Sequence, residues 1–212
     1  MSGSSRGRQR TARPDAVAWV TLPFPILATI TTFAIRLRTM RMRRLQAIAD
    51  RTGLSLEANY TRPSRLKGDF RGHALVMTSM PKRRSSGKRR RTLVTVDMKN
   101  PEFLRLRMRR QDRAHHPFRA AEFEIGDSRF DGRFFIQSDE PVLVRDIIRD
   151  DDLRDALIRS DIYSAQAVGP TLQVVYDGRL EDPTQAELVF TAATSLADAI
   201  DGLRGGDDQN SV

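Results

Sequence analysis

The chain has 212 residues, which is long enough for one domain with short additional segments. It contains no cysteine, which excludes disulfide bonds and thiolate-bound metals. The formal net charge of +9 is divided unevenly: residues 51–120 contain 19 basic and 5 acidic side chains, whereas residues 121–212 contain 8 and 20. This distribution indicates either an anionic partner, such as nucleic acid or a lipid surface, or attraction between two parts of one fold.

A basic tail and a long uncharged segment begin the chain. Residues 1–15 are rich in Ser, Gly and Arg without apolar periodicity, so we expect disorder there, as we do for residues 205–212. Residues 16–35 (AVAWVTLPFPILATITTFAI) carry no charge, and a helix of this length would rise roughly 30 Å, the thickness of a bilayer's hydrocarbon core. Trp19 lies near one end, where aromatic side chains favour the membrane interface. The segment predicts a single transmembrane or membrane-anchoring helix.

The arginine-rich segment that follows, RLRTMRMRR (36–44), would stop translocation and place the remaining chain on the cytoplasmic side. Three alternatives stay open for residues 16–35. A cleaved signal peptide would need small residues where the arginines stand. A buried core hairpin would form if Pro23 and Pro25 broke the helix. A helix that starts at Pro25 would be too short to span and would lie in the interface.

Apolar residues continue at helical spacing beyond the arginines, so residues 36–53 predict a juxtamembrane helix that ends at Gly53. An alternative for residues 45–55 (LQAIADRTGLS) is the first helix and turn of a DNA-binding helix-turn-helix. Its recognition helix would be interrupted by Pro63, so we favour a helix followed by a strand.

Residues 54–204 predict one α+β domain. Period-two alternation indicates strands at residues 55–62, 72–80, 92–98, 103–110 and 134–137. A further strand is expected between residues 172 and 180. Helical patterns occupy residues 142–148, 151–159 and 184–203. This order of elements predicts an antiparallel sheet meander with helices packed on one face.

Clustered basic residues are the candidate functional surface. The loop KRRSSGKRRR (82–91) is strongly cationic, and in FLRLRMRR (103–110) the arginines alternate with Leu and Met, so they should share one face of a strand. The candidate contacts to an anionic surface are Arg36, Arg38, Arg41, Arg43, Arg44, Lys82, Arg83, Arg84, Lys88, Arg89, Arg90, Arg91, Arg105, Arg107 and Arg109. Anionic lipid or an acidic protein surface is the preferred counter-charge. Nucleic acid is less favoured because few aromatic residues accompany these stretches.

No residue pattern indicates a catalytic, cofactor or metal site. His115 and His116 are adjacent in an arginine-rich loop, where diverging side chains and positive charge disfavour a metal. His73 falls in a predicted strand. Asp150, Asp151 and Asp152 precede a predicted helix and suit its N-terminal cap and dipole. We therefore expect no cofactor.

One motif is distinctive. Gly126, Asp127, Phe130, Asp131 and Phe134 form a G-D-x-x-F-D-x-x-F pattern. We expect the two phenylalanines one helical turn apart against the core, and the two aspartates hydrogen-bonded within the turn. The pattern resembles a signature that recurs in uncharacterised prokaryotic domains, many of them membrane-anchored. The resemblance covers roughly residues 45–203 and implies a strand meander before the motif, then a helix, a strand pair and a terminal helix.

These features predict a membrane-tethered α+β module that is not an enzyme and that acts by surface interaction with lipid or protein. One alternative is a nucleic-acid-binding protein held at the membrane. Another is an enzyme with a site near Asp127 and Asp131, where a carboxylate pair could bind a metal.

Overall fold

The computed structural model of the protein describes residues 24–58, 63–80, 90–99, 104–111 and 122–202. The two tails expected to be disordered, residues 1–15 and 205–212, lie outside these ranges. The chain divides into two units, Met1–Thr39 and Met40–Val212. The described helices are α1 (Phe24–Thr52), α2 (Ser128–Asp131), α3 (Pro141–Ile147), α4 (Asp151–Arg159) and α5 (Pro183–Gly202). The described strands are β1 (Ser55–Glu57), β2 (Arg65–Phe70), β3 (His73–Met80), β4 (Arg91–Asp97), β5 (Leu106–Arg110), β6 (Phe134–Ser138), β7 (Ile162–Val168) and β8 (Thr171–Tyr176).

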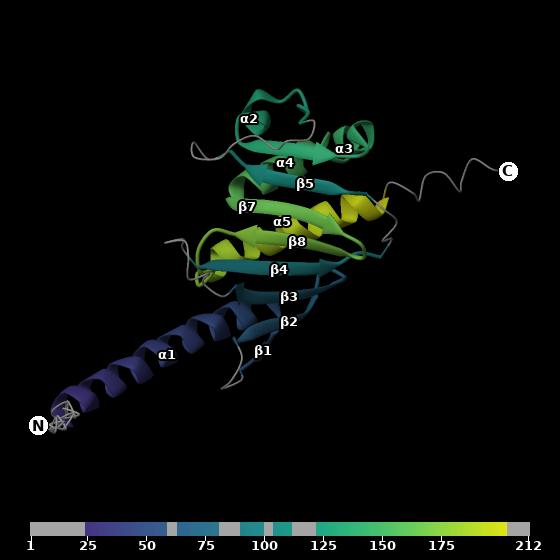
Figure 1. The fold of residues 1–212 in the computed structure, drawn as a ribbon. Helices are drawn as coiled ribbons and strands as arrows, with labels where there is room; N and C mark the ends of the chain where they lie inside the picture. The colour runs from purple at the N-terminus through teal and green to yellow at the C-terminus, as the bar shows by residue number, and fades with distance from the viewer. Residues whose placement is uncertain (1–23, 59–62, 81–89, 100–103, 112–121, 203–212) are drawn as a thin grey trace, which may run out of the picture. The chain divides into compact units, whose positions relative to one another are not determined.

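The strands form one antiparallel sheet in the order β1-β2-β3-β4-β8-β7-β5-β6 (Figure 1). The predicted α+β class with an antiparallel sheet is confirmed. The first four strands are a meander, but the β7–β8 hairpin then lies between β4 and β5. The arginine-bearing strand β5 therefore lies next to β7, which follows it by about fifty residues in the sequence.

Two strands were not predicted from the sequence, β2 and β7. The predicted strand 55–62 is short in the structure, with β1 ending at Glu57 and residues 59–62 outside the described ranges. The helix 151–159 has the predicted bounds, and the helices at 142–148 and 184–203 are each found one residue earlier.

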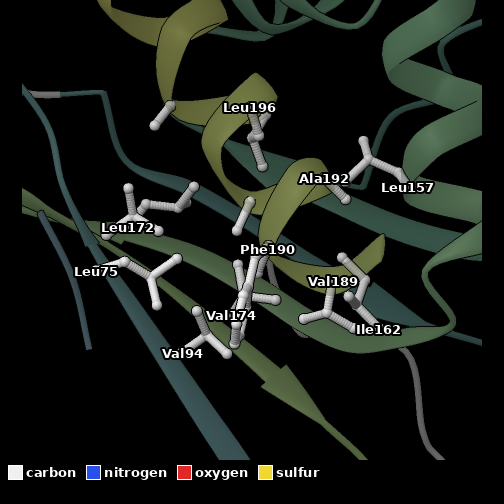
Figure 2. Close-up of a cluster of buried hydrophobic side chains, with 14 of the residues drawn as sticks. Leu75, Val94, Leu157, Ile162, Leu172, Val174, Val189, Phe190, Ala192 and Leu196 are labelled. Carbon is white, nitrogen blue, oxygen red and sulfur yellow. The ribbon is translucent and has the colours of Figure 1, made fainter. Parts of the chain in front are cut away.

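The hydrophobic core lies between one face of the sheet and the helices. Figure 2 shows Phe190 and Leu196 of α5 directed at Val94 and Leu172 on the strands, and all four side chains are fully buried. The ring of Phe190 also meets Phe70 of β2 edge to face, with centroids 5.8 Å apart. Burial of this apolar area, at about 25 cal/mol per Å², is the main stabilising term. Helix α5 thus covers one sheet face, and α3 and α4 pack against α5.

The end of α1 belongs to the domain. Leu45 and Ile48 are buried, and the helix ends at Gly53, whose φ of +74° is left-handed and whose N–H donates to the carbonyl of Ala49 at 2.9 Å. The predicted helix end at Gly53 is confirmed. Residues Ser55–Glu57 then form a strand, so no recognition helix follows and the helix-turn-helix alternative is wrong.

The unit Met1–Thr39 contains the first part of α1, which begins at Phe24. Phe33, Ile35 and Leu37 are exposed there at 63%, 66% and 52%. Residues 16–23 of the predicted transmembrane segment lie outside the described ranges. Within those ranges, no helix combines the length and the apolar character needed to cross a bilayer.

Candidate anion-binding face of the sheet

The sheet face opposite α5 is lined by the alternate side chains of every long strand. Pairing registers place one row across it, which runs through Lys67, Val76, Thr95, Gln173, Gln166, Arg107 and Gln137. The adjacent row contains Arg65 of β2 and Arg109 of β5, with Ser164 opposite Arg109. Leu106 and Met108 are buried on the other face, so the predicted separation of arginine and apolar faces in this strand is confirmed.

Arg91, Arg109 and Tyr163 meet on this face. The Nε and Nη2 atoms of Arg109 donate to the Tyr163 hydroxyl oxygen at 3.1 and 2.5 Å. The guanidinium carbon of Arg91 lies 3.9 Å from the centroid of the Tyr163 ring, and that of Arg109 lies 5.3 Å from it. Both arginines therefore make cation–π contacts with one ring that is only 4% exposed.

A β-bulge in β7 explains how Tyr163 reaches the arginines. Ile162 pairs with Tyr176 and Ser164 with Val175, so Tyr163 is an extra residue between two pairs. Ile162 stays in the core, and the bulge lets the tyrosine ring turn to the opposite face. Strand β8 ends at Tyr176, and Arg91 extends past this end to Asp177, with 3.4 Å between Nε and Oδ1.

A cavity of about 300 Å³ opens at this cluster and is lined by Arg91, Arg107, Arg109, Tyr163, Ser164, Ala165 and Gln166. Three guanidinium groups thus surround a small space, and the carboxylate of Asp177 contacts that of Arg91. Such a lining attracts anions, because arginine offers several N–H donors in a rigid planar arrangement.

A larger cavity of about 640 Å³ adjoins the first and shares Arg107 and Gln166 with it. Leu104, Leu106 and Val168 contribute apolar surface to its lining. It forms where β5 and β7 stop pairing, since their register ends at Arg107 and Gln166.

The structure separates the predicted basic candidates into groups. Arg91, Arg107 and Arg109 line the small cavity, and Arg105 lines the larger one. Arg90 is exposed just before β4. Arg36, Arg38 and Arg43 are exposed on α1. Lys82, Arg83, Arg84, Lys88 and Arg89 lie outside the described residues, as do His115 and His116.

Other predicted candidates are engaged within the domain. Arg41 donates to the Ser79 hydroxyl at 2.8 Å, and Arg44 pairs with Glu181 at 2.5 Å. Burial, together with the nearby charge of Arg179, lowers the pKa of Arg41. These two arginines are therefore held by protein groups, which makes them poorer candidates for a lipid surface.

Ion pairs join the basic and acidic parts of the chain. Besides Arg44 and Glu181, they include Arg51 with Glu187, Arg91 with Asp177 and Arg110 with Asp161. Some of the opposite charges of the two parts therefore pair within the fold. This agrees with the interpretation that the charge distribution reflects attraction between two parts of one fold.

The G-D-x-x-F-D segment is a hydrogen-bonded turn. Asp127 caps α2 by accepting from the N–H groups of Arg129 and Phe130 at 2.9 and 3.2 Å, and its other oxygen pairs with Arg154 at 3.0 Å. The carboxylate of Asp131 accepts from the N–H groups of residues 125 and 126 at 2.9 and 2.8 Å. The predicted role of both aspartates in the turn is confirmed.

The expected helical spacing of Phe130 and Phe134 is wrong. Helix α2 ends at Asp131, and Phe134 begins β6 after a turn at Gly132. The rings nevertheless touch, with centroids 5.0 Å apart, and both are buried. The contact that was expected along one helix is made between a helix and a strand. In the part of the chain that the structure describes, no group of three His, Cys, Asp or Glu residues is arranged to hold a metal.

Sequence reasoning missed two residues that the structure places in polar clusters, Tyr163 and His73. The imidazole of His73 is buried, with Nδ1 3.0 Å from the carbonyl oxygen of Asp97 and Nε2 2.7 Å from Asp198. Its alternation with Leu75 and Met77 was a signal, because it places a histidine on the core face, where a polar group needs partners. The predicted cap at Asp150 is confirmed, since its side chain accepts from the Asp152 N–H at 2.9 Å.

Comparison with protein families, with curated proteins and with solved structures found no match to this chain.

Proposed function

We propose that this protein is a membrane-tethered α+β module that faces the cytoplasm and acts through surface interactions with lipid or protein, without catalysing a reaction. One observation carries the proposal. Residues 16–35 form an uncharged segment of twenty residues, and arginines follow it directly from residue 36. Such a segment favours a bilayer, and the arginines favour the anionic cytoplasmic surface.

Exposed side chains on α1 support the tether. Phe33 and Leu37, both in the unit Met1–Thr39, are four residues apart, and each is at least 52% exposed. Residues at this spacing lie on one side of a helix. Because apolar surface in water costs about 25 cal/mol per Å², contact with lipid would stabilise this arrangement.

The tether could span the bilayer or lie in its interface, and we propose that it spans. The part of α1 from Phe24 to Ile35 would rise about 18 Å, which is less than the roughly 30 Å of hydrocarbon. A spanning helix therefore needs residues 16–23 as well. The resemblance of the signature at residues 126–134 to domains that are often membrane-anchored agrees with a spanning tether.

Membrane fractionation of the full-length chain tests this proposal. A spanning tether keeps the protein in the membrane pellet after extraction with alkaline carbonate, whereas an interfacial helix is released. Phe33→Glu with Ile35→Glu should weaken attachment. The matched pair Val142→Glu with Val168→Glu, which changes exposed apolar residues of the domain, should not. A full-length chain that stays in the supernatant without detergent would refute the tether.

The structure offers less support for the two alternatives. Binding of single-stranded nucleic acid usually needs exposed rings for base stacking, and the Tyr163 ring is covered by two guanidinium groups. The carboxylates of Asp127 and Asp131, which the enzyme alternative requires, are occupied by backbone N–H groups.

A further inference from the structure

We propose that the cavity between Arg91, Arg109 and Tyr163 binds the phosphate group of a phosphomonoester. This site does not depend on the proposed membrane tether, because Arg91, Arg109 and Tyr163 all belong to the unit Met40–Val212.

Unused hydrogen-bond donors are the first argument. The Nε and Nη2 atoms of Arg109 are occupied by the tyrosine oxygen, which leaves Nη1 without an acceptor among the described residues. The described acceptor for Arg91 is Asp177, whose Oδ1 lies 3.4 Å from Nε, a long distance for a hydrogen bond. Both terminal nitrogens of Arg91 are therefore without an acceptor among the described residues. The Tyr163 hydroxyl accepts twice, and its own proton has no acceptor in the described ranges. These donors all belong to residues that line the cavity.

The match between charged donors and acceptor oxygens is the second argument. Arg91 and Arg109 bring two guanidinium cations to the cavity lining. Their three remaining terminal nitrogens, Nη1 of Arg109 and both of Arg91, match the three terminal oxygens of a phosphomonoester better than the two of a carboxylate. The Arg91 side chain is 28% exposed, so water screens its charge only in part and a bound anion would be favoured.

The third argument is that the site is formed before any ligand arrives. Arg91, Arg109 and Tyr163 lie on strands of one sheet, and the tyrosine hydroxyl fixes the orientation of the Arg109 guanidinium. The Tyr163 ring likewise supports Arg91 by a cation–π contact. Donors that are already oriented lose little conformational entropy on binding, which strengthens the interaction.

The two cavities together suggest what carries the phosphate. A space of about 300 Å³ accommodates a phosphate group but not a nucleic-acid duplex. The adjoining cavity of about 640 Å³ shares Arg107 and is partly apolar, so it can receive the organic part of the ligand. The shared chemistry is that of a monoalkyl phosphate, and its source is either a soluble metabolite or a phosphatidic acid headgroup.

Isothermal titration calorimetry on the full-length chain in neutral detergent tests the site. The probes are inorganic phosphate, hexyl phosphate and water-soluble dibutanoyl phosphatidic acid, each at constant ionic strength in chloride. We expect hexyl phosphate to bind more tightly than inorganic phosphate. Tighter binding of hexyl phosphate than of phosphatidic acid identifies a soluble ligand, and the reverse order identifies a lipid headgroup.

Substitutions assign the binding to this cavity. Arg109→Gln and Arg91→Gln should each weaken hexyl phosphate binding about tenfold or more, because each removes charge-assisted donors. Tyr163→Phe keeps the ring but loses the hydroxyl, so it should weaken binding even if an arginine variant does not fold. Arg65→Gln is the matched control, since Arg65 is an exposed arginine on the same face but outside the cavity.

Two results would overturn the proposal. One is the absence of binding by all three probes to the wild-type chain. The other is an equal loss of affinity in Arg65→Gln and Arg109→Gln, which would show that the charge of the whole face attracts the anion. Neither result bears on the membrane tether, which carbonate extraction tests separately.

Discussion

The Nε2 atom of His73 lies 2.7 Å from the Oδ1 atom of Asp198, so a fully buried imidazole on β3 is joined to an exposed carboxylate on α5. The other ring nitrogen lies 3.0 Å from the carbonyl oxygen of Asp97. Both partners are acceptors, and a neutral imidazole has only one N–H to donate. The two hydrogen bonds therefore form together only when His73 is protonated.

This arrangement predicts that stability falls as the pH rises. Burial lowers the pKa of His73, but the hydrogen bonds to Asp198 and Asp97 and the charge of Asp198 outweigh it, so the pKa is raised above 6.5. The protonated imidazole stabilises the fold fully below its unfolded pKa of about 6.5, and this stabilisation is lost as pH rises through the folded pKa. An NMR titration of His73 should show the raised value, and urea unfolding should show the loss.

Asp198→Asn is the variant that checks this cause. It should reduce the free energy of unfolding by about 1–3 kcal/mol at low pH, because it weakens a hydrogen bond of a buried charged group. It should also flatten the pH dependence above the unfolded pKa of about 6.5. Glu187→Gln, on the same helix, is the control and should leave the pH dependence unchanged. If the free energy of unfolding of Asp198→Asn depended on pH as strongly as that of the wild type, the pH dependence could not be assigned to the His73–Asp198 pair.

The cap of α2 predicts a second pH dependence, of opposite sign. The N–H groups of Phe130 and Arg129 and the charge of Arg154 lower the pKa of Asp127. Its ionised form therefore stabilises the fold above the unfolded pKa, and this contribution is lost as pH falls through the folded pKa. Asp127→Asn should be less stable than wild type at neutral pH and nearly equal to it in acid. Urea unfolding at both pH values measures this difference, and an equal deficit at both would argue against it.

Phe130 is predicted to be the main apolar anchor of the G-D-x-x-F-D segment. It is fully buried and its ring contacts Phe134. Phe130→Ala should cost about 3–5 kcal/mol in the free energy of unfolding, because it leaves a cavity in a close-packed core. Val142→Ala, at a residue 71% exposed, should change it by less than about 0.5 kcal/mol. Similar losses in both variants, measured by denaturant unfolding, would show that the segment is not anchored in this way.

Gly53 is predicted to be required for its backbone conformation. Its φ is +74°, and an added Cβ would meet nothing within 4 Å, so any cost of substitution comes from the backbone. Gly53→Ala should cost about 1–2 kcal/mol, whereas Gly53→Asn should cost less, because asparagine tolerates left-handed conformations. Thermal unfolding of the two variants makes the comparison. Equal stability of the alanine variant and wild type would be the contrary result.

Local patterns in the sequence were enough to predict several elements. The bounds of α4 follow from the aspartates at its start. The end of α1 follows from the glycine after it, Gly53. The alternation in β5 likewise predicted which side chains share a face. Each of these features depends on residues within a few positions of one another.

Features that depend on distant residues were missed. Strand β2 (RLKGDF) contains Gly68, which breaks the alternating pattern of the strand. A glycine is needed there because of a tertiary contact, since a Cβ at this position would lie 3.1 Å from the Leu54 side chain. The cavity needs Arg91 beside Tyr163, and this contact depends on a strand order and a bulge that no local pattern indicates. The candidate arginines could thus be named from the sequence, but not the tyrosine that organises them.

The membrane tether is tested most directly by the environment of residue 33. The chain has no native cysteine, so Phe33→Cys and the control Val142→Cys can each be labelled with an environment-sensitive fluorophore in the full-length protein. In vesicles, the tether predicts a blue-shifted emission from position 33 that is quenched by lipid-attached quenchers, with no such effect at position 142. Equal, water-like emission from both positions would contradict it.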